Sequence, residues 1–106
     1  MRSKFYTVLC YIIILFGVIH LFFTSCLESF DSYALWFIGA GIAIIFAGFI
    51  NLIKTKSSDK IIYTICILTN VIMTALFSLA LFAMQDTQVF IGIFIFGLAL
   101  FSSLRK

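Results

Sequence analysis

Long apolar runs alternate with short polar stretches along the whole chain. The runs cover residues 5–25, 34–53, 61–83 and 89–104, and none of them contains Lys, Arg, Asp or Glu. In a helix, about 20 apolar residues cross the hydrocarbon core of a bilayer, at ~1.5 Å of rise per residue. The pattern therefore predicts four transmembrane helices. The fourth is short at 16 residues, with Arg105 and Lys106 able to snorkel at its end.

The runs favour helices over strands. Strands of a membrane barrel alternate apolar and polar residues, whereas these runs are apolar on all sides. A helix satisfies its own backbone hydrogen bonds in lipid, and the short polar connections make consecutive helices neighbours. We therefore predict an all-α fold, with a single transmembrane domain over residues 1–106 built as an integral membrane antiparallel four-helix bundle.

Composition supports a membrane location. Hydrophobic residues make up 64% of the chain and charged residues 10%, against ~25% charged residues in average soluble domains. A soluble domain this small buries only about 60% of the surface that its unfolded chain exposes. Much of the apolar surface must therefore face a solvent other than water, and the lipid bilayer is the partner that this composition predicts.

Charge is divided unequally between the two sides of the predicted bundle. With four spans, all seven Lys and Arg residues fall on one side. Three of the four acidic residues fall on the other side: Glu28, Asp31 and Asp86. Because basic residues in short loops mark the cytoplasmic side, we predict a cell-membrane protein with both termini and the middle loop in the cytoplasm. The basic residues lie at membrane boundaries, so nucleic acid is not an expected partner.

A few uncharged polar residues are expected at the boundaries of the membrane. Tyr6 and Tyr63 would lie in the aromatic belt on the inner side, with Tyr33 and Trp36 in the belt on the outer side. Asn51 ends the second predicted helix at the inner boundary, where it would cap backbone carbonyls or lie among lipid headgroups.

An alternative interpretation treats residues 1–26 as a cleaved signal peptide. The chain begins with basic Arg2 and Lys4, and Thr24-Ser25-Cys26 resembles a lipoprotein cleavage site. The apolar segment of a signal peptide is usually about 7–15 residues long, and the first run here has 21. The sequence therefore favours a transmembrane helix at this position.

Polar residues inside the runs are the candidates for a site. The third run places Cys66, Asn70, Thr74 and Ser78 at four-residue spacing, which predicts one polar helix face. Such a face either hydrogen-bonds neighbouring helices, at roughly 0.6 kcal/mol per bond, or lines a path for a solute or water. The first role is favoured, with Asn70 facing the bundle interior. The candidate intramembrane polar site consists of His20, Asn70, Thr74 and Ser78. His20 is included because an ionisable residue inside a span is a functional hypothesis by default.

Small residues are regularly spaced in the second run. Gly39, Ala43 and Ala47 follow one another at four-residue intervals and predict a ridge against which another helix packs. Gly41 and Gly48 are expected on a neighbouring face. The packing helix belongs either to this chain or to another one, so a homo-oligomer and a complex with another membrane protein both stay open.

No catalytic constellation is visible in the sequence. It contains no Gly-rich phosphate loop, no metal-ligand spacing of His, Cys and Asp, and no carboxylate pair inside a span. Cys10 and Cys66 are expected to act as small hydrophobic residues. Cys26 is expected on the outer side as a free thiol or an intermolecular bridge. We therefore predict no enzyme, no catalytic or metal-binding residue and no cofactor.

The second run also carries a resemblance. Together with His20, the stretch Ala34-Leu35-Trp36-Phe37-Ile38-Gly39-Ala40-Gly41, continuing to Asn51, resembles uncharacterised small bacterial four-span membrane proteins with an ALWFxGAG run. The resemblance implies a bacterial inner-membrane protein and carries no function. In length and span count the chain is similar to small multidrug resistance transporters. Those depend on a glutamate in the first helix, whereas the only glutamate here, Glu28, lies in a loop.

Two functions follow from these patterns. The favoured one is a non-enzymatic structural, accessory or interaction protein of the membrane, because every polar residue has a plausible packing role. The alternative is a small oligomeric transporter or channel that uses the polar face of the third helix. A hydrated cavity reaching Asn70 favours the alternative, and a dry, closed bundle favours the first function.

Overall fold

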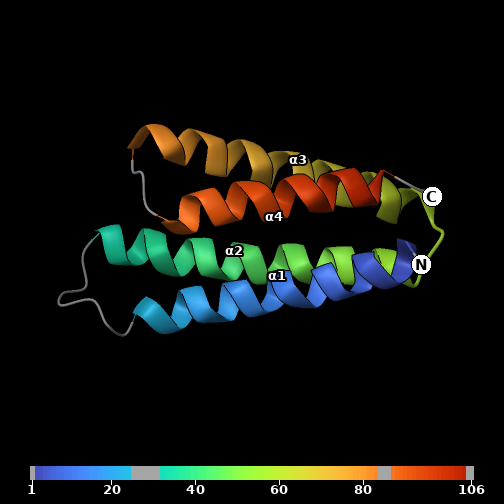
Figure 1. The fold of residues 1–106 in the computed structure, drawn as a ribbon, viewed down its shortest axis with the longest axis horizontal. Helices are drawn as coiled ribbons and strands as arrows, with labels where there is room; N and C mark the ends of the chain where they lie inside the picture. Colours follow the sequence, from blue (N-terminus) through green and yellow to red (C-terminus); the bar gives the residue numbers. More distant parts are fainter. Residues whose placement is uncertain (1, 25–31, 84–86, 105–106) are drawn as a thin grey trace.

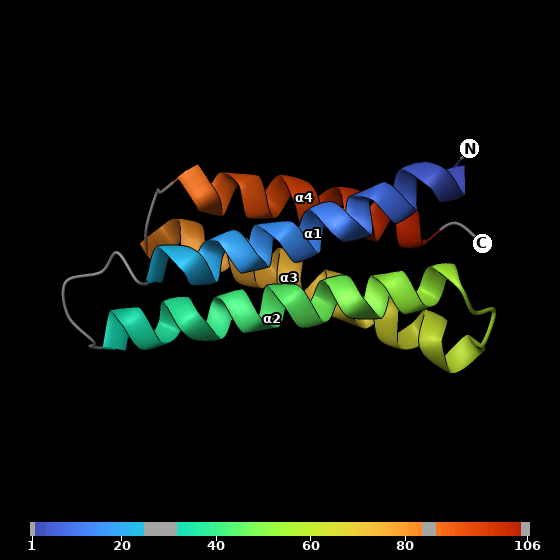
Figure 2. The same ribbon diagram turned by 90° about the horizontal axis from the view of Figure 1, so that it is seen from below.

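The computed structural model describes residues 2–24, 32–83 and 87–104. They form four helices: α1 (Arg2–Thr24), α2 (Ser32–Thr55), α3 (Lys60–Ala83) and α4 (Thr87–Ser103). The helices run antiparallel in sequence order as an all-α bundle of 44 × 24 × 23 Å (Figures 1 and 2). The predicted all-α antiparallel four-helix bundle is therefore confirmed, and its helix boundaries differ from the expected ranges by at most three residues.

The two ends of the bundle differ. At one end, here called the terminal end, α1 begins, α4 ends and the α2–α3 connection turns (Figure 1). At this connection the Asp59 carboxylate accepts a hydrogen bond of 3.0 Å from the backbone N–H of Ile61. An aspartate in this position caps a helix N-terminus, which explains why α3 begins at Lys60. The opposite end is called the far end.

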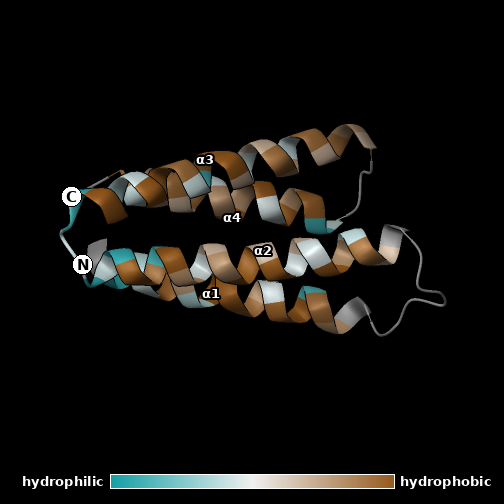
Figure 3. Cartoon of the chain, turned by 180° about the vertical axis from the view of Figure 1, so that it is seen from behind, coloured by the Kyte–Doolittle hydropathy of each residue, from teal (hydrophilic) through white to brown (hydrophobic). Residues whose placement is uncertain are grey.

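Three helices, α1, α2 and α3, are long and apolar enough to cross a membrane. Helix α4 is apolar too but has only 17 residues, about 25 Å at ~1.5 Å per residue, against about 30 Å for the hydrocarbon core. Large apolar side chains cover the outside of the bundle, and Phe82 is 87% exposed. Brown, hydrophobic residues cover the helices in Figure 3, and many hydrophilic ones gather at the terminal end. These features are those of a small multi-pass membrane protein in contact with lipid.

Glycines bring α1 and α2 close together. A Cβ atom on Gly17 would lie 2.6 Å from Cγ1 of Ile45 and 3.0 Å from the carbonyl oxygen of Gly41. A Cβ atom on Gly48 would lie 2.6 Å from Cγ1 of Ile14. A Cβ atom on Gly41 would lie 2.8 Å from Cδ2 of Leu21. Three positions along the two helices therefore have no room for a side chain, and small residues are what allow helices in lipid to approach this closely.

The close approach uses a different face of α2 from the predicted one. Gly39 is exposed, and a Cβ atom added there would meet nothing within 4 Å. Ala43 is partly buried and Ala47 is buried. Residues four apart rotate by about 40° around an α-helix, so a straight line of four-residue steps leaves the interface. Most buried positions of α2 instead alternate between three- and four-residue steps: Ala34, Phe37, Gly41, Ile44, Gly48 and Asn51. Ala40 and Ala47 are buried beside them.

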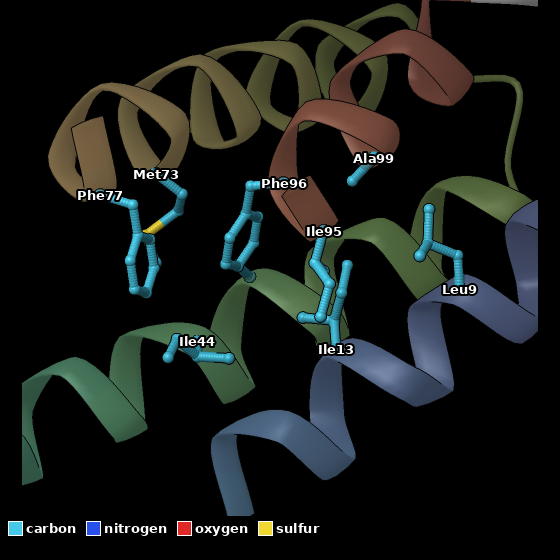
Figure 4. Close-up of a cluster of buried hydrophobic side chains, with 9 residues drawn as sticks. Leu9, Ile13, Ile44, Met73, Phe77, Ile95, Phe96 and Ala99 are labelled. Carbon is cyan, nitrogen blue, oxygen red and sulfur yellow. The ribbon is translucent and has the colours of Figure 1, made fainter. Parts of the chain in front are cut away.

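The apolar core draws on all four helices (Figure 4). Ile13 and Ile44 from the first hairpin face Met73, Phe77 and Phe96 from the second. The rings of Phe77 and Phe96 are stacked, with centroids 5.8 Å apart. This core joins the two hairpins, α1–α2 and α3–α4, along the middle of the bundle.

Candidate functional site

Polar side chains from all four helices meet between the core and the terminal end. They are Tyr6 of α1, Asn51 of α2, Cys66 and Asn70 of α3, and Ser103 of α4, here called the asparagine cluster. Asn51, Cys66, Asn70 and Ser103 have no exposed surface, and Tyr6 is 5% exposed. The cluster is therefore enclosed by the bundle.

Two asparagine amides form the centre of the asparagine cluster. The Nδ2 of Asn51 donates to Oδ1 of Asn70 at 2.9 Å, and the Nδ2 of Asn70 donates to Oδ1 of Asn51 at 2.8 Å. The second N–H of Asn51 reaches the carbonyl oxygen of Ala47 at 2.8 Å. The reciprocal pair joins the first hairpin to the second, because α2 supplies one amide and α3 the other.

The other members of the cluster bind the asparagine pair from the flanking helices. The hydroxyl of Tyr6 donates to Oδ1 of Asn51 at 2.6 Å, and the thiol of Cys66 donates to the same oxygen at 3.1 Å. The Nδ2 of Asn70 also donates to Oγ of Ser103 at 3.1 Å. Hydrogen bonds of the two amides thus reach every helix of the bundle.

This arrangement satisfies both buried amides. A primary amide carries two N–H donors and one oxygen acceptor, and each of these groups has a partner in Asn51 and in Asn70. An unpaired amide in an apolar environment costs roughly 2–7 kcal/mol, whereas an interhelical hydrogen bond in a membrane contributes about 0.6 kcal/mol. The main effect of these hydrogen bonds is therefore to avoid the cost of a buried, unpaired amide. This cost disfavours any helix arrangement in which the two amides are not paired.

The expectation for Asn70 is confirmed in one respect: the residue faces the interior and hydrogen-bonds the second helix. The polar face of α3 does not continue as predicted. Thr74 is partly buried, and its hydroxyl donates to the backbone oxygen of Asn70 at 2.8 Å. Ser78 is exposed. The cause is again the rotation of four-residue steps, since Met73 and Phe77 occupy the buried positions.

His20 lies apart from the asparagine cluster, in the far half of the bundle. Its ring stacks on Phe37 of α2, with centroids 4.0 Å apart and an interplanar angle of 10°. Together with Trp36, Phe77 and Gln88, His20 lines a cavity of about 20 Å³, which has room for about one water molecule. The four predicted site residues therefore do not form one site.

Sequence reasoning missed part of the asparagine cluster. The expected bond from Asn51 to a backbone carbonyl is present, at Ala47. The sequence did not predict that Asn51 and Tyr6 are buried in the bundle and hydrogen-bonded to each other. Ser103 was not singled out. An asparagine in each of two otherwise apolar runs was the available signal, because two amides in lipid need partners and each can serve the other. Cys10 and Cys66 are buried thiols, as expected for small hydrophobic residues, although Cys66 also donates a hydrogen bond. Cys26, Glu28, Asp31 and Asp86 lie outside the described residues.

Within the described ranges, no group of three or more His, Cys, Asp or Glu side chains could hold a metal ion. Comparison of the chain with protein-family models, curated proteins and solved structures finds no match to any of them. The resemblance to small bacterial four-span proteins therefore stays a prediction from the second apolar run.

Proposed function

We propose that the chain is a four-span protein of the cell membrane with the terminal end of the bundle in the cytoplasm. The three long apolar helices support a membrane location. The fourth span rests on α4, which is apolar along its 17 residues and is followed by Arg105 and Lys106. The orientation rests on the seven basic residues, all of which belong to the terminal end by the order of the helices.

Reporter fusions test the orientation. A reporter that is active only in the cytoplasm should be active when fused to either terminus or inserted at Ser58, in the α2–α3 connection. A reporter active only outside should work when inserted near Asp31 or Asp86. An external signal from one of the termini would overturn the proposed topology.

For the role of the bundle, we infer that the protein is a non-enzymatic structural, accessory or interaction protein, whose interior holds its helices together and passes no solute. One observation carries this proposal: the amide of Asn70 is fully buried, with its donors and acceptor engaged by other helices. A transport path along α3 would need these groups to exchange protein partners for water or solute.

The transporter or channel hypothesis is the second candidate, and the cavity at His20 is the observation in its favour. This cavity lies in the far half and is lined mostly by apolar side chains, among them Met73, Phe77 and Val89. Asn70 is not among the residues that line it. A continuous path would therefore require a further opening between His20 and the asparagine cluster.

Thiol labelling separates the two hypotheses. In a background with Cys10→Ala, Cys26→Ser and Cys66→Ser, the variant Asn70→Cys is reconstituted in lipid nanodiscs and exposed to a membrane-impermeant maleimide. Ser58→Cys, at an exposed position, is the reactive control, and Ile44→Cys, at a fully buried position, is the unreactive one. A dry bundle predicts that position 70 reacts as slowly as position 44. Labelling at the rate of position 58 would favour the transporter.

A further inference from the structure

Lys54 is the penultimate residue of α2, and its ammonium lies over two tyrosine rings. Nζ is 5.5 Å from the centroid of the Tyr6 ring on α1 and 5.2 Å from that of the Tyr63 ring on α3. Both distances are within the range of cation–π attraction. The ammonium of Lys54 is therefore held where three helices meet at the terminal end.

Hydrogen bonds fix the two rings that hold Lys54. The hydroxyl of Tyr6 donates to Asn51 inside the asparagine cluster at 2.6 Å. The hydroxyl of Tyr63 donates to the backbone oxygen of Leu104, just after α4, at 3.2 Å. Each ring is thus tied to a second helix or its end, so the position of the ammonium is set by the whole bundle. An ammonium positioned in advance loses less conformational freedom when it binds a ligand than a freely rotating one does.

The surroundings of Lys54 are strongly basic and partly apolar. Lys4, Lys56 and Lys60 are exposed at the same end. The sequence assigns all seven basic residues to this end and a single acidic one, Asp59. The apolar side chains of Ile53 and Ile61 are 52% and 68% exposed next to these charges. A ligand that fits this surface carries negative charge on one part and apolar chains on another.

We propose that Lys54, positioned by Tyr6 and Tyr63, binds the phosphate of an anionic phospholipid in the leaflet that surrounds the terminal end. A lysine ammonium is a common phosphate ligand, and a lysine at the end of a membrane helix extends its head to the depth of the lipid headgroups. The acyl chains would lie against exposed apolar residues such as Ile53 and Ile61. Free phosphate offers the same charge but has nothing to place on the apolar surface.

Native mass spectrometry of the full chain tests this site. The protein is reconstituted in vesicles with equal amounts of phosphatidylcholine and phosphatidylglycerol, then extracted, and the ratio of the two retained lipids is measured. Removing a direct hydrogen bond between a lysine and a lipid phosphate should lower the relative retention of phosphatidylglycerol about tenfold, since a hydrogen bond to a charged group contributes ~1.5 kcal/mol. We expect this loss in Lys54→Gln, recovery in Lys54→Arg, and little change in Lys60→Gln, which removes a charge at the same end.

Three results would overturn the proposal. Equal losses in Lys54→Gln and Lys60→Gln would indicate diffuse attraction to the basic surface. Unchanged retention in Lys54→Gln would show that the residue does not bind the lipid. Displacement of phosphatidylglycerol by inorganic phosphate would indicate a site for the free ion. Both leaflets of these vesicles have the same composition, so the outcome does not depend on the proposed topology.

Discussion

The two halves of the bundle hold their helices together by different means. Between the core and the terminal end, the paired amides of Asn51 and Asn70 accept a hydrogen bond from α1 and donate to α4. In the far half, contacts between rings dominate: His20 stacks on Phe37, and Phe77 covers Gly92. The far half also has the cavity of about 20 Å³. Directional hydrogen bonds therefore join the helices near the terminal end. Apolar contacts join them in the far half, where packing is less complete.

This difference indicates which interactions fix the relative positions of the helices in the bundle. In lipid, apolar helices gain little from contacting one another rather than the acyl chains. Ring and methyl contacts tolerate small rotations and shifts of a helix. A reciprocal amide pair does not, because a shift leaves donors and acceptors unpaired at several kcal/mol. We infer that the asparagine cluster sets the register of the hairpins, and that the far half follows.

The largest effect should come from breaking the amide pair. Asn70→Leu leaves the amide of Asn51 buried without its main partner, which should destabilise the bundle by about 1–3 kcal/mol. The free energy of unfolding in a detergent–denaturant titration measures this loss. Thr74→Val is the matched control on the same helix, because the hydroxyl of Thr74 bonds within α3. Equal losses in the two variants would contradict a special role for the pair.

A smaller effect is expected from overfilling the far half. A Cβ atom on Gly92 would lie 2.5 Å from the ring of Phe77. The ring can tilt, so Gly92→Ala should cost about 1–2 kcal/mol, within the usual range for overpacking. Gly97→Ala on the same helix is the control, because a Cβ atom there would meet nothing within 4 Å. The same titration compares them, and indistinguishable stabilities would mean that the far half is loosely packed.

The smallest effect is expected at the stacked rings. His20→Leu removes the contact with Phe37 at 4.0 Å and should cost about 0.5–1 kcal/mol, the usual contribution of an aromatic pair. His20→Phe keeps a ring in place and should cost less. If both substitutions were equally harmful, the imidazole would have a role beyond stacking, and the transporter hypothesis would gain support.

The sequence was sufficient to predict the helices but not which face of each helix is buried. Four uncharged runs predicted all four helices, because burying charge in lipid is costly and the lengths match a bilayer. Interfaces were harder to predict. Four-residue spacing indicated Gly39 on α2 and Ser78 on α3, and both are exposed. The buried faces instead follow steps of three and four residues, as expected for helices that pack at small angles.

The site was predicted in part. A buried asparagine is costly without partners, so the interior position of Asn70 followed from its chemistry. The identity of its partner, Asn51, could not be predicted in the same way. Asn51 lies near the end of α2, and a residue there can face lipid headgroups as well as the interior. Whether an end residue turns inward depends on the relative depth of two helices, and no pattern within one helix contains that information.

A double-mutant cycle at Asn51 and Asn70 tests the central claim most directly. Unfolding free energies are measured for the parent, Asn51→Leu, Asn70→Leu and the double variant. If the two amides serve each other, each single variant strands the remaining one, and the double variant removes both. The double variant should then be less destabilised than the sum of the single variants by about 0.5–3 kcal/mol. Additivity within about 0.3–0.5 kcal/mol would mean that the pair does not hold the hairpins together.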